Sequence, residues 1–240
     1  MKAGLRRLVG EAWAFRALVE HDAARRFTRL AEAISAFDRD SPVVPLMHRA
    51  AGDEARHAAL CEELSLAYGR PVQAPDAAPV EIAPAQLGPR QAVLYEVVAA
   101  CCITETESVA TVATLLAEPS ETRVRQVLHE IARDEVVHGR MGWTHLSREA
   151  GLGDVSFLAP WIPVMLAGTV DDGLFADARG EEPAEELMRH GVLPHARKRE
   201  IFVGTLRDVV FPGLEKFGID TAPARSWLDA RTTAPAPGSA

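Results

Sequence analysis

The sequence predicts an all-α protein that folds as a four-helix bundle with one long crossover connection. Apolar residues recur with the helical period of 3.6 in four separate stretches, and β-branched runs punctuated by regular turns are missing. Of the 240 residues, 48% are hydrophobic and 25% are charged. This is the composition of a globular protein, and the chain is long enough for one large domain or two small ones.

We expect the four bundle helices at residues 5–37, 43–68, 90–116 and 122–149. Proline, serine and glycine residues mark their ends, namely Ser41 with Pro42, Gly69 with Pro71, Pro119 with Ser120, and Gly151. Only a few residues separate the first helix from the second, and the third from the fourth. Because short connections force neighbouring helices to run antiparallel, each of these pairs should form a helical hairpin.

The connection between the second and third helices is much longer. Residues 69–90 contain five prolines in 22 positions. An extended proline-rich segment advances about 3.1 Å per residue, whereas a helix of about 25 residues is only about 38 Å long. The connection can therefore cross the full height of the bundle, which allows the second and third helices to run parallel.

After residue 150 the helical pattern loosens. Pro160 and Pro163 break an apolar stretch, and residues 198–218 predict a further helix that is interrupted at Pro212. The last residues, TTAPAPGSA, have the composition of a disordered tail. We therefore expect a bundle in residues 1–150, a helical extension packed on it in residues 151–228, and a tail in residues 229–240.

Charge and composition argue against two classes of partner. The net charge of -8, with no Lys/Arg-rich run interleaved with aromatic residues, argues against nucleic acid. No window approaches the about 20 apolar residues of a membrane span, so we expect no membrane association. The three cysteines, Cys61, Cys101 and Cys102, form no CxxC pair or disulfide framework. These features favour a cytoplasmic protein in which the cysteines pack as small apolar residues.

Two stretches, GDEARHA at residues 52–58 and RDEVVHG at residues 133–139, contain the same pattern Asp-Glu-x-x-His. In both, the Glu and the His lie one helical turn apart on a face that is otherwise apolar. The other two helices each carry a single acid on their apolar face. Glu20, for example, lies in line with Trp13 and Phe27, each seven residues away. The candidate ligands are Glu20, Glu54, His57, Glu105, Glu135 and His138.

Four carboxylates that face one apolar core require cations, because an unpaired buried carboxylate costs many kcal/mol. The apolar faces contain no matching Lys or Arg. Two metal ions held by four Glu and two His satisfy this requirement, and mixed carboxylate and imidazole ligands favour iron or manganese. Glu107 lies on a more polar face of the third helix and is the alternative to Glu105.

This ligand pattern resembles that of the ferritin-like di-iron carboxylate bundles, and the resemblance covers residues 5–149. GDEARHA is also similar to the Asp-Glu-x-Arg-His motif of the bacterial multicomponent hydroxylases. That similarity implies that Asp53, Arg56 and Asp134 orient the histidines. In the ribonucleotide reductase small subunit, a radical-bearing Tyr lies four residues after the first motif's His. Here Cys61 has that position, which argues against a stored tyrosyl radical and leaves space in the pocket for O2 and substrate.

The resemblance implies an O2-activating di-iron oxidoreductase, of the oxygenase, hydroxylase or N-oxygenase type, that oxidises a small organic substrate. Two iron ions are the expected cofactors, with manganese as the alternative, and O2 is the co-substrate. An external electron donor and a homodimer are possible partners. A ferroxidase or other metal-handling ferritin-like protein is the first alternative, and a non-catalytic helical interaction module with a structural metal is the second.

Overall fold

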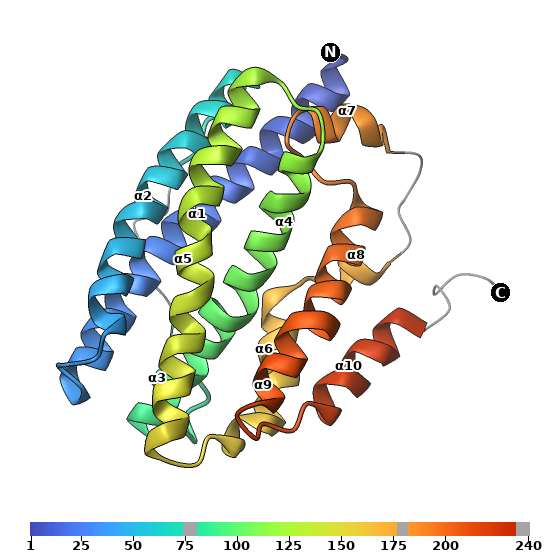
Figure 1. Ribbon diagram of the computed structural model, residues 1–240. Coiled ribbons are helices and arrows are strands. Elements are labelled where there is room, and N and C mark those ends of the chain that lie inside the picture. Colours follow the sequence, from blue (N-terminus) through green and yellow to red (C-terminus); the bar gives the residue numbers. More distant parts are fainter. Residues whose placement is uncertain (74–80, 177–181, 234–240) are drawn as a thin grey trace.

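The structure is a computed structural model, and it describes residues 1–73, 81–176 and 182–233. Within these residues every regular element is a helix and no strand occurs, so the predicted all-α fold class is confirmed. Four long helical segments lie side by side, and shorter helices cover one side of them (Figure 1).

The long segments begin and end close to their predicted positions. Three of them are single helices, α1 (Ala3–Phe37), α2 (Val43–Ala67) and α5 (Thr122–Leu152). The remaining one has three consecutive parts, α3 (Pro89–Val97), the π-helical segment η1 (Val98–Thr104) and α4 (Glu105–Ala117). The period of 3.6 therefore holds on both sides of η1 but not within it.

The direction of the chain alternates within each helical hairpin. The helices α1 and α2 run antiparallel, and so do α4 and α5, whereas α2 runs in the same direction as α3 and α4 (Figure 1). The long connection makes this parallel arrangement possible, although its residues 74–80 lie outside the described residues. Because α2 packs against α5 as well as α1, the two Asp-Glu-x-x-His motifs lie on neighbouring helices.

Two apolar clusters fill the bundle on either side of the predicted ligands. One includes Trp13, Leu64, Val112 and Leu128. The other includes Phe27, Met47, Cys101 and Met141. On each long segment the predicted ligand lies between a residue of one cluster and a residue of the other. The ligands therefore form a polar layer that is closed at both ends by apolar side chains.

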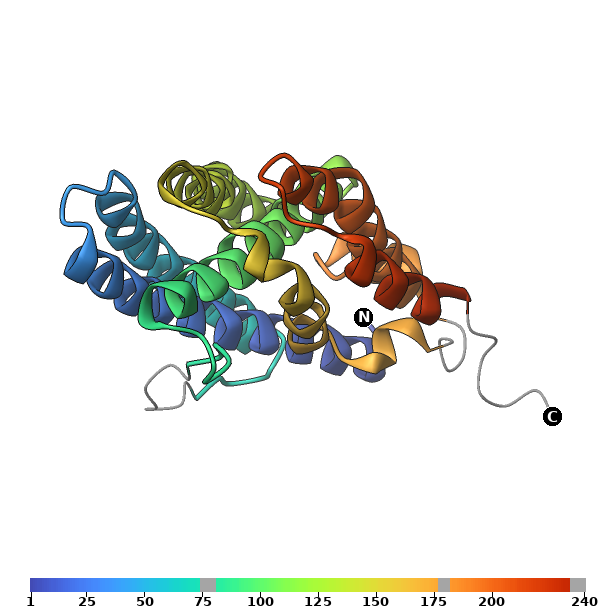
Figure 2. The same ribbon diagram turned by 90° about the horizontal axis from the view of Figure 1, so that it is seen from below.

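The chain after α5 forms short helices that pack on α3, η1 and α5. They are η2 (Ser156–Trp161), α6 (Ile162–Thr169), η3 (Asp172–Phe175), α7 (Ala184–Arg189), α8 (His195–Thr205), η4 (Leu206–Val210), α9 (Phe211–Glu215) and α10 (Ala222–Thr233). A third apolar cluster joins Tyr95 and Leu146 of the bundle to Phe202 and Phe211 of these helices. In Figure 2, α8, α9 and α10 lie on the side of α4 that faces away from α2.

Two details of this region differ from the prediction. The helix expected to be interrupted at Pro212 continues, because the π-helical η4 leads directly into α9, where Pro212 is the second residue. Pro212 has no N–H to donate, and the π-helical turn directly before it interrupts the α-helical hydrogen-bond pattern at this point. Residues 229–233, expected to belong to a disordered tail, are helical, because α10 continues to Thr233. Residues 234–240 lie outside the described residues.

One helical stretch, Pro89–Ala117, is long and apolar enough to cross a membrane by length and composition, contrary to the expectation from the sequence. In the structure 56% of its most apolar window is buried inside the protein, and the stretch carries the buried acids Glu96 and Glu105. A core helix that is covered on most sides has the same composition. This stretch is therefore weak evidence for a membrane span.

Gly142 of α5 provides a test of how closely α5 and η1 pack. A Cβ atom on Gly142 would lie 2.5 Å from Cβ and 2.8 Å from the carbonyl carbon of Cys101. We predict that Gly142→Ala lowers the free energy of unfolding by about 1 to 3 kcal/mol, measured by chemical denaturation. The control is Gly139→Ala on the same helix, where a Cβ would meet Val109 at an ordinary 3.5 Å. Equal effects of the two substitutions would contradict the close packing.

Candidate metal centre

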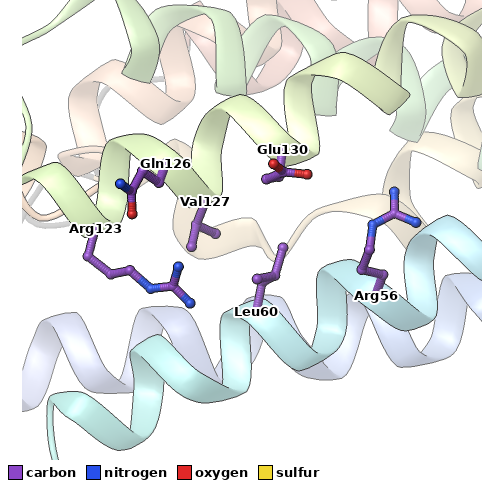
Figure 3. Close-up of a pocket in the computed structure, with 6 residues that line it drawn as sticks. All are labelled: Arg56, Leu60, Arg123, Gln126, Val127 and Glu130. Atoms are coloured by element: carbon purple, nitrogen blue, oxygen red, sulfur yellow. The ribbon is translucent and has the colours of Figure 1, made fainter.

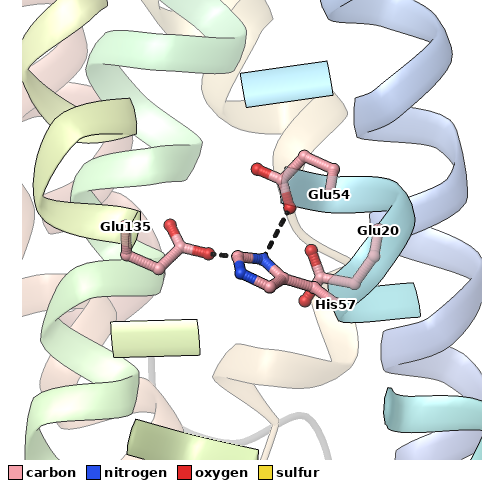
Figure 4. Close-up of side chains that lie close together, drawn as sticks. All are labelled: Glu20, Glu54, His57 and Glu135. Atoms are coloured by element: carbon pink, nitrogen blue, oxygen red, sulfur yellow. Dashed lines mark hydrogen bonds and ion pairs between the residues drawn. The ribbon is translucent and has the colours of Figure 1, made fainter. Parts of the chain in front are cut away.

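The structure brings all six predicted ligand side chains together in the polar layer of the bundle. Their ligand-type atoms form two groups, and within each group these atoms lie within 4.8 Å of one another. The first group is Glu20, Glu54, His57 and Glu135, and the second is Glu54, Glu105, Glu135 and His138. Figure 4 shows the side chains of the first group converging from α1, α2 and α5. Glu54 and Glu135 belong to both groups.

Other buried acids in this protein have arginine partners. Glu96 forms an ion pair with Arg29, and Glu149 accepts two hydrogen bonds from Arg90, at 2.7 and 2.9 Å. In contrast, none of the four cluster glutamates forms an ion pair with Arg or Lys anywhere in the described residues, although all four are buried. Their only basic contacts are His57 and His138. The cluster therefore lacks the neutralisation that the protein provides to its other buried acids.

Each histidine of the cluster is held by the aspartate of the opposite motif. Nε2 of His57 lies 3.2 Å from Oδ2 of Asp134, and Nε2 of His138 lies 3.4 Å from Oδ2 of Asp53. Arg56 donates hydrogen bonds to both aspartates and so joins α2 to α5. In both imidazoles Nδ1 faces the glutamates, and Nδ1 of His57 lies 3.1 Å from Oε2 of Glu54. Once Nδ1 has lost its proton, the aspartate that accepts the Nε2 proton fixes the tautomer whose Nδ1 lone pair can bind a metal.

Several ligand-type atoms in the cluster have no hydrogen-bond partner among the residues that the structure describes, namely Glu54 Oε1, Glu135 Oε2 and His138 Nδ1. His138 Nδ1 and Glu54 Oε1 lie only 2.8 Å apart, yet their orientation does not make a hydrogen bond. A buried polar atom without a partner costs about 1 to 3 kcal/mol, so such atoms are rare in native proteins. Their arrangement fits a set of oxygen and nitrogen ligands placed around cations, which the metals predicted from the sequence would satisfy.

Burial and mutual repulsion determine which of these acids hold protons without metal. Burial raises the pKa of Glu20 and of Glu135 well above the usual value, and it raises the pKa of Glu105 to about 7. Burial also opposes ionisation of Glu54, but the neighbouring His138 and His57 outweigh it and lower its pKa to about 2. Metal ions must therefore displace protons from at least some of the glutamates.

Two other candidates from the sequence lie next to the cluster. Glu107 is not part of either ligand group, and its carboxylate accepts a hydrogen bond from Thr111 at 2.8 Å. The geometry therefore favours Glu105 over Glu107. Cys61 is buried one turn after His57 and packs in the same apolar cluster as Trp13. Burial, followed by the charge of Glu20, raises the pKa of the Cys61 thiol, so this side chain is an apolar wall of the site.

The sequence did not reveal the π-helical segment η1, which ends directly before Glu105. In a π-helix the turn widens, and here the Thr104 hydroxyl donates to the carbonyl of Ala99, five residues earlier, at 3.1 Å. The widened turn changes the direction in which the side chain of the next residue points from the helix axis. The segment therefore sets the direction from which Glu105 enters the cluster.

A groove of about 410 Å³ lies between α2 and α5, outside the cluster (Figure 3). Its lining residues are Arg56, Leu60, Arg123, Gln126, Val127 and Glu130. None of the six cluster residues lines this groove, and Arg56 connects the groove directly to the aspartates that hold the histidines.

No protein-family model, curated protein or solved structure matches this chain. The resemblance to the ferritin-like di-iron bundles therefore rests on the ligand pattern in the sequence alone.

Replacement of Glu135 and of Glu107 distinguishes the ligand set from its alternative. We predict that Glu135→Ala abolishes binding of both metal ions, because Glu135 belongs to both ligand groups, whereas Glu107→Ala retains it. The measurement is metal content per chain after anaerobic loading with Fe(II) or Mn(II) and removal of free metal. A greater loss of metal in Glu107→Ala would show that Glu107, and not Glu105, is the ligand from the third helical segment.

Thermal unfolding at two pH values tests whether the glutamates share one buried site. A buried acid whose pKa is raised in the folded protein stabilises the fold at pH values below its pKa in the unfolded chain, about 4.5. This stability is lost as the pH rises through its pKa in the folded protein, which is about 7 for Glu105. We predict that metal raises Tm more at pH 8 than at pH 5.5, because it removes the repulsion between ionised glutamates and competes with protons at low pH. The difference in Tm between metal-free and Mn(II)-loaded protein is taken at each pH. Groups that titrate in the same way in both forms therefore do not contribute to it. An equal or smaller shift at pH 8 would mean that the carboxylates do not share a buried site.

Proposed function

We propose that this chain binds two iron ions in the Glu and His cluster and activates O2 to oxidise a small organic substrate, with manganese as the alternative metal. The observation that carries the proposal is the set of six buried ligand side chains with no Arg or Lys ion-pair partner in the described residues. Four carboxylates and two imidazoles suit iron or manganese better than a thiolate-binding metal.

The two ligand groups suggest which residues would hold each ion. Glu20 and His57 occur only in the first group, and Glu105 and His138 only in the second, while Glu54 and Glu135 are common to both. Glu54 and Glu135 would therefore be shared between the ions. When bound, two iron ions supply electrons for the reduction of O2 and the oxidising power for the substrate.

The residues around the ligands have three tasks. Asp134 and Asp53 hold the histidine tautomers that present Nδ1 to the metals. The two apolar clusters on either side of the polar layer exclude bulk water, which protects a reactive centre from side reactions. The tyrosines lie outside both ligand groups, since Tyr68 is hydrogen-bonded to His190 and Tyr95 packs on Trp161. This supports oxidation of an external substrate over storage of a tyrosyl radical.

Anaerobic reconstitution with Fe(II) tests this function. We expect about two iron ions per chain, followed by a new absorbance band and O2 consumption when the protein is exposed to air. Glu54→Gln is the matched loss-of-ligand variant, and Glu107→Gln is the control that should behave as the wild type. Iron uptake far beyond two per chain would favour a ferroxidase or storage protein. Loading without any reaction with O2 would favour a structural metal.

A further inference from the structure

A tyrosine and a tryptophan of the bundle meet at His190, in the loop between α7 and α8. The hydroxyl oxygen of Tyr68 lies 3.0 Å from Nδ1 of His190, and the two rings pack edge to face with their centroids 5.6 Å apart. Trp13 donates its indole N–H to the main-chain carbonyl of the same histidine at 2.9 Å. Tyrosine and tryptophan lose one electron more readily than most side chains. His190 therefore connects two side chains that can be oxidised.

The oxidation of a tyrosine needs a base, because a phenol that has lost an electron is a strong acid. In the tautomer with its proton on Nε2, His190 accepts a hydrogen bond from the Tyr68 hydroxyl at Nδ1. Oε1 of Glu121 lies 3.5 Å from the same Nδ1, and its negative charge stabilises the imidazolium that forms when the proton arrives. Burial, followed by the charge of Glu121, raises the pKa of Tyr68 to about 12. The phenol therefore keeps its proton at neutral pH until it is oxidised.

Tyr95, the other of the two tyrosines, lacks this arrangement. It packs edge to face on Trp161, with the ring centroids 6.5 Å apart, and its hydroxyl forms no hydrogen bond in the part of the chain that the structure describes. Tyr95 is 2% exposed, whereas Tyr68 is half-buried. Of the two tyrosines, Tyr68 is therefore the one with a base beside it and with access to solvent.

Trp13 shortens the path from Tyr68 to the metal centre. Along α2, Tyr68 follows Glu54 by 14 residues, which is about 21 Å of helix. Along α1, Trp13 precedes Glu20 by seven residues on the same face, which is about 10 Å. Trp13 is 1% exposed, and its apolar cluster adjoins the polar layer of ligands. Because electron transfer slows steeply with distance, two steps through Trp13 are faster than one direct step.

We propose that Tyr68 is a redox-active residue that gives one electron through Trp13 to the oxidised metal centre and its proton to His190. This step rests on the function proposed above, in which O2 oxidises the bound iron. The O–H bond of Tyr68 breaks, an N–H bond forms at Nδ1 of His190, the centre gains one electron, and a neutral tyrosyl radical remains. A small one-electron reductant such as ascorbate then supplies the electron that restores the phenol, and His190 returns the proton.

The relay removes oxidising equivalents from the centre when no organic substrate is bound. Tyr68 lies outside both ligand groups, and its half-buried position lets a soluble reductant reach the ring. Its radical is therefore transient, and oxidation of an external substrate is still the main reaction of the centre.

Photochemical oxidation of the metal-free protein tests the pair of Tyr68 and His190 without iron. Light-excited tris(bipyridine)ruthenium(II) with persulfate removes electrons from side chains, and electron paramagnetic resonance of frozen samples detects tyrosyl radicals. We expect a tyrosyl radical in the wild type and in Tyr95→Phe, and its loss in Tyr68→Phe. His190→Gln should form the radical at least about tenfold more slowly, because the base is removed while the main-chain carbonyl that binds Trp13 remains. Circular dichroism should show the same helix content in all variants.

The same detection in Fe(II)-loaded protein that is mixed with O2, without an organic substrate, tests the relay. We expect the Tyr68 radical to form as the iron is oxidised, and to form at least about tenfold more slowly in Trp13→Phe, which keeps an aromatic ring but is harder to oxidise. In the photochemical experiment Trp13→Phe should behave as the wild type, because the ruthenium complex oxidises Tyr68 from solvent. An equal loss in both experiments would mean that Trp13 acts only through the fold, and would overturn the relay.

The remaining outcomes separate this inference from the proposed function. The inference is overturned if the wild type gives no Tyr68 radical on photochemical oxidation, if His190→Gln reacts as fast as the wild type, or if the radical formed with iron and O2 persists in Tyr68→Phe. Oxidation of bound iron by O2 without any tyrosyl radical would refute only this inference. A protein that takes up no iron but forms the photochemical radical would refute the proposed function, and the relay with it, and leave the pair of Tyr68 and His190 standing.

Discussion

The desolvation of four glutamates in one layer of the bundle is the constraint on which the rest of the structure depends. A carboxylate removed from water remains ionised only if a cation or several donors compensate it. The protein compensates Glu96 and Glu149 with arginines, whereas in the described part of the chain the ion pairs of the cluster glutamates are all with His57 and His138. The apolar clusters on both sides of the layer contribute to folding by burial, and they also keep water away from the acids. The same packing therefore stabilises the fold and keeps the glutamates out of water, in an arrangement that could hold metal ions.

The contacts behind the ligands link the two hairpins. Because each histidine is bound by the aspartate of the other motif, neither motif can adopt its geometry alone. The duplication is not fully symmetrical, since Val137, which is 37% exposed, replaces the arginine in the second motif. Arg133 partly replaces it, with Nε 3.3 Å from Oδ1 of Asp134. Each histidine thus contacts an aspartate that is bound by arginine, but Arg133 contacts only Asp134, whereas Arg56 contacts both aspartates.

The helices after α5 cover the third helical segment, where α8 packs on α4 and both α6 and η4 pack on η1. Trp13 of α1 donates a hydrogen bond to the carbonyl of His190 at 2.9 Å, and Gly191, with φ of +72°, packs closely against the Trp13 ring. These contacts attach the loop before α8 to α1. The extension is therefore attached to α1 as well as to the third helical segment.

The sequence by itself determined the four long helical segments and the six side chains of the cluster. The apolar period of 3.6 is strong in long helices, and an acid on such a face is conspicuous because its burial is costly. Only the tertiary structure decided the contact of each histidine with the aspartate of the other motif, the π-helical turn before Glu105, and the place of Glu107 outside both ligand groups. The reason is physical: residues such as His57 and Asp134, 77 positions apart along the chain, meet only when helices have packed. The angle of a side chain within a helical face also depends on local turns that the periodicity does not encode.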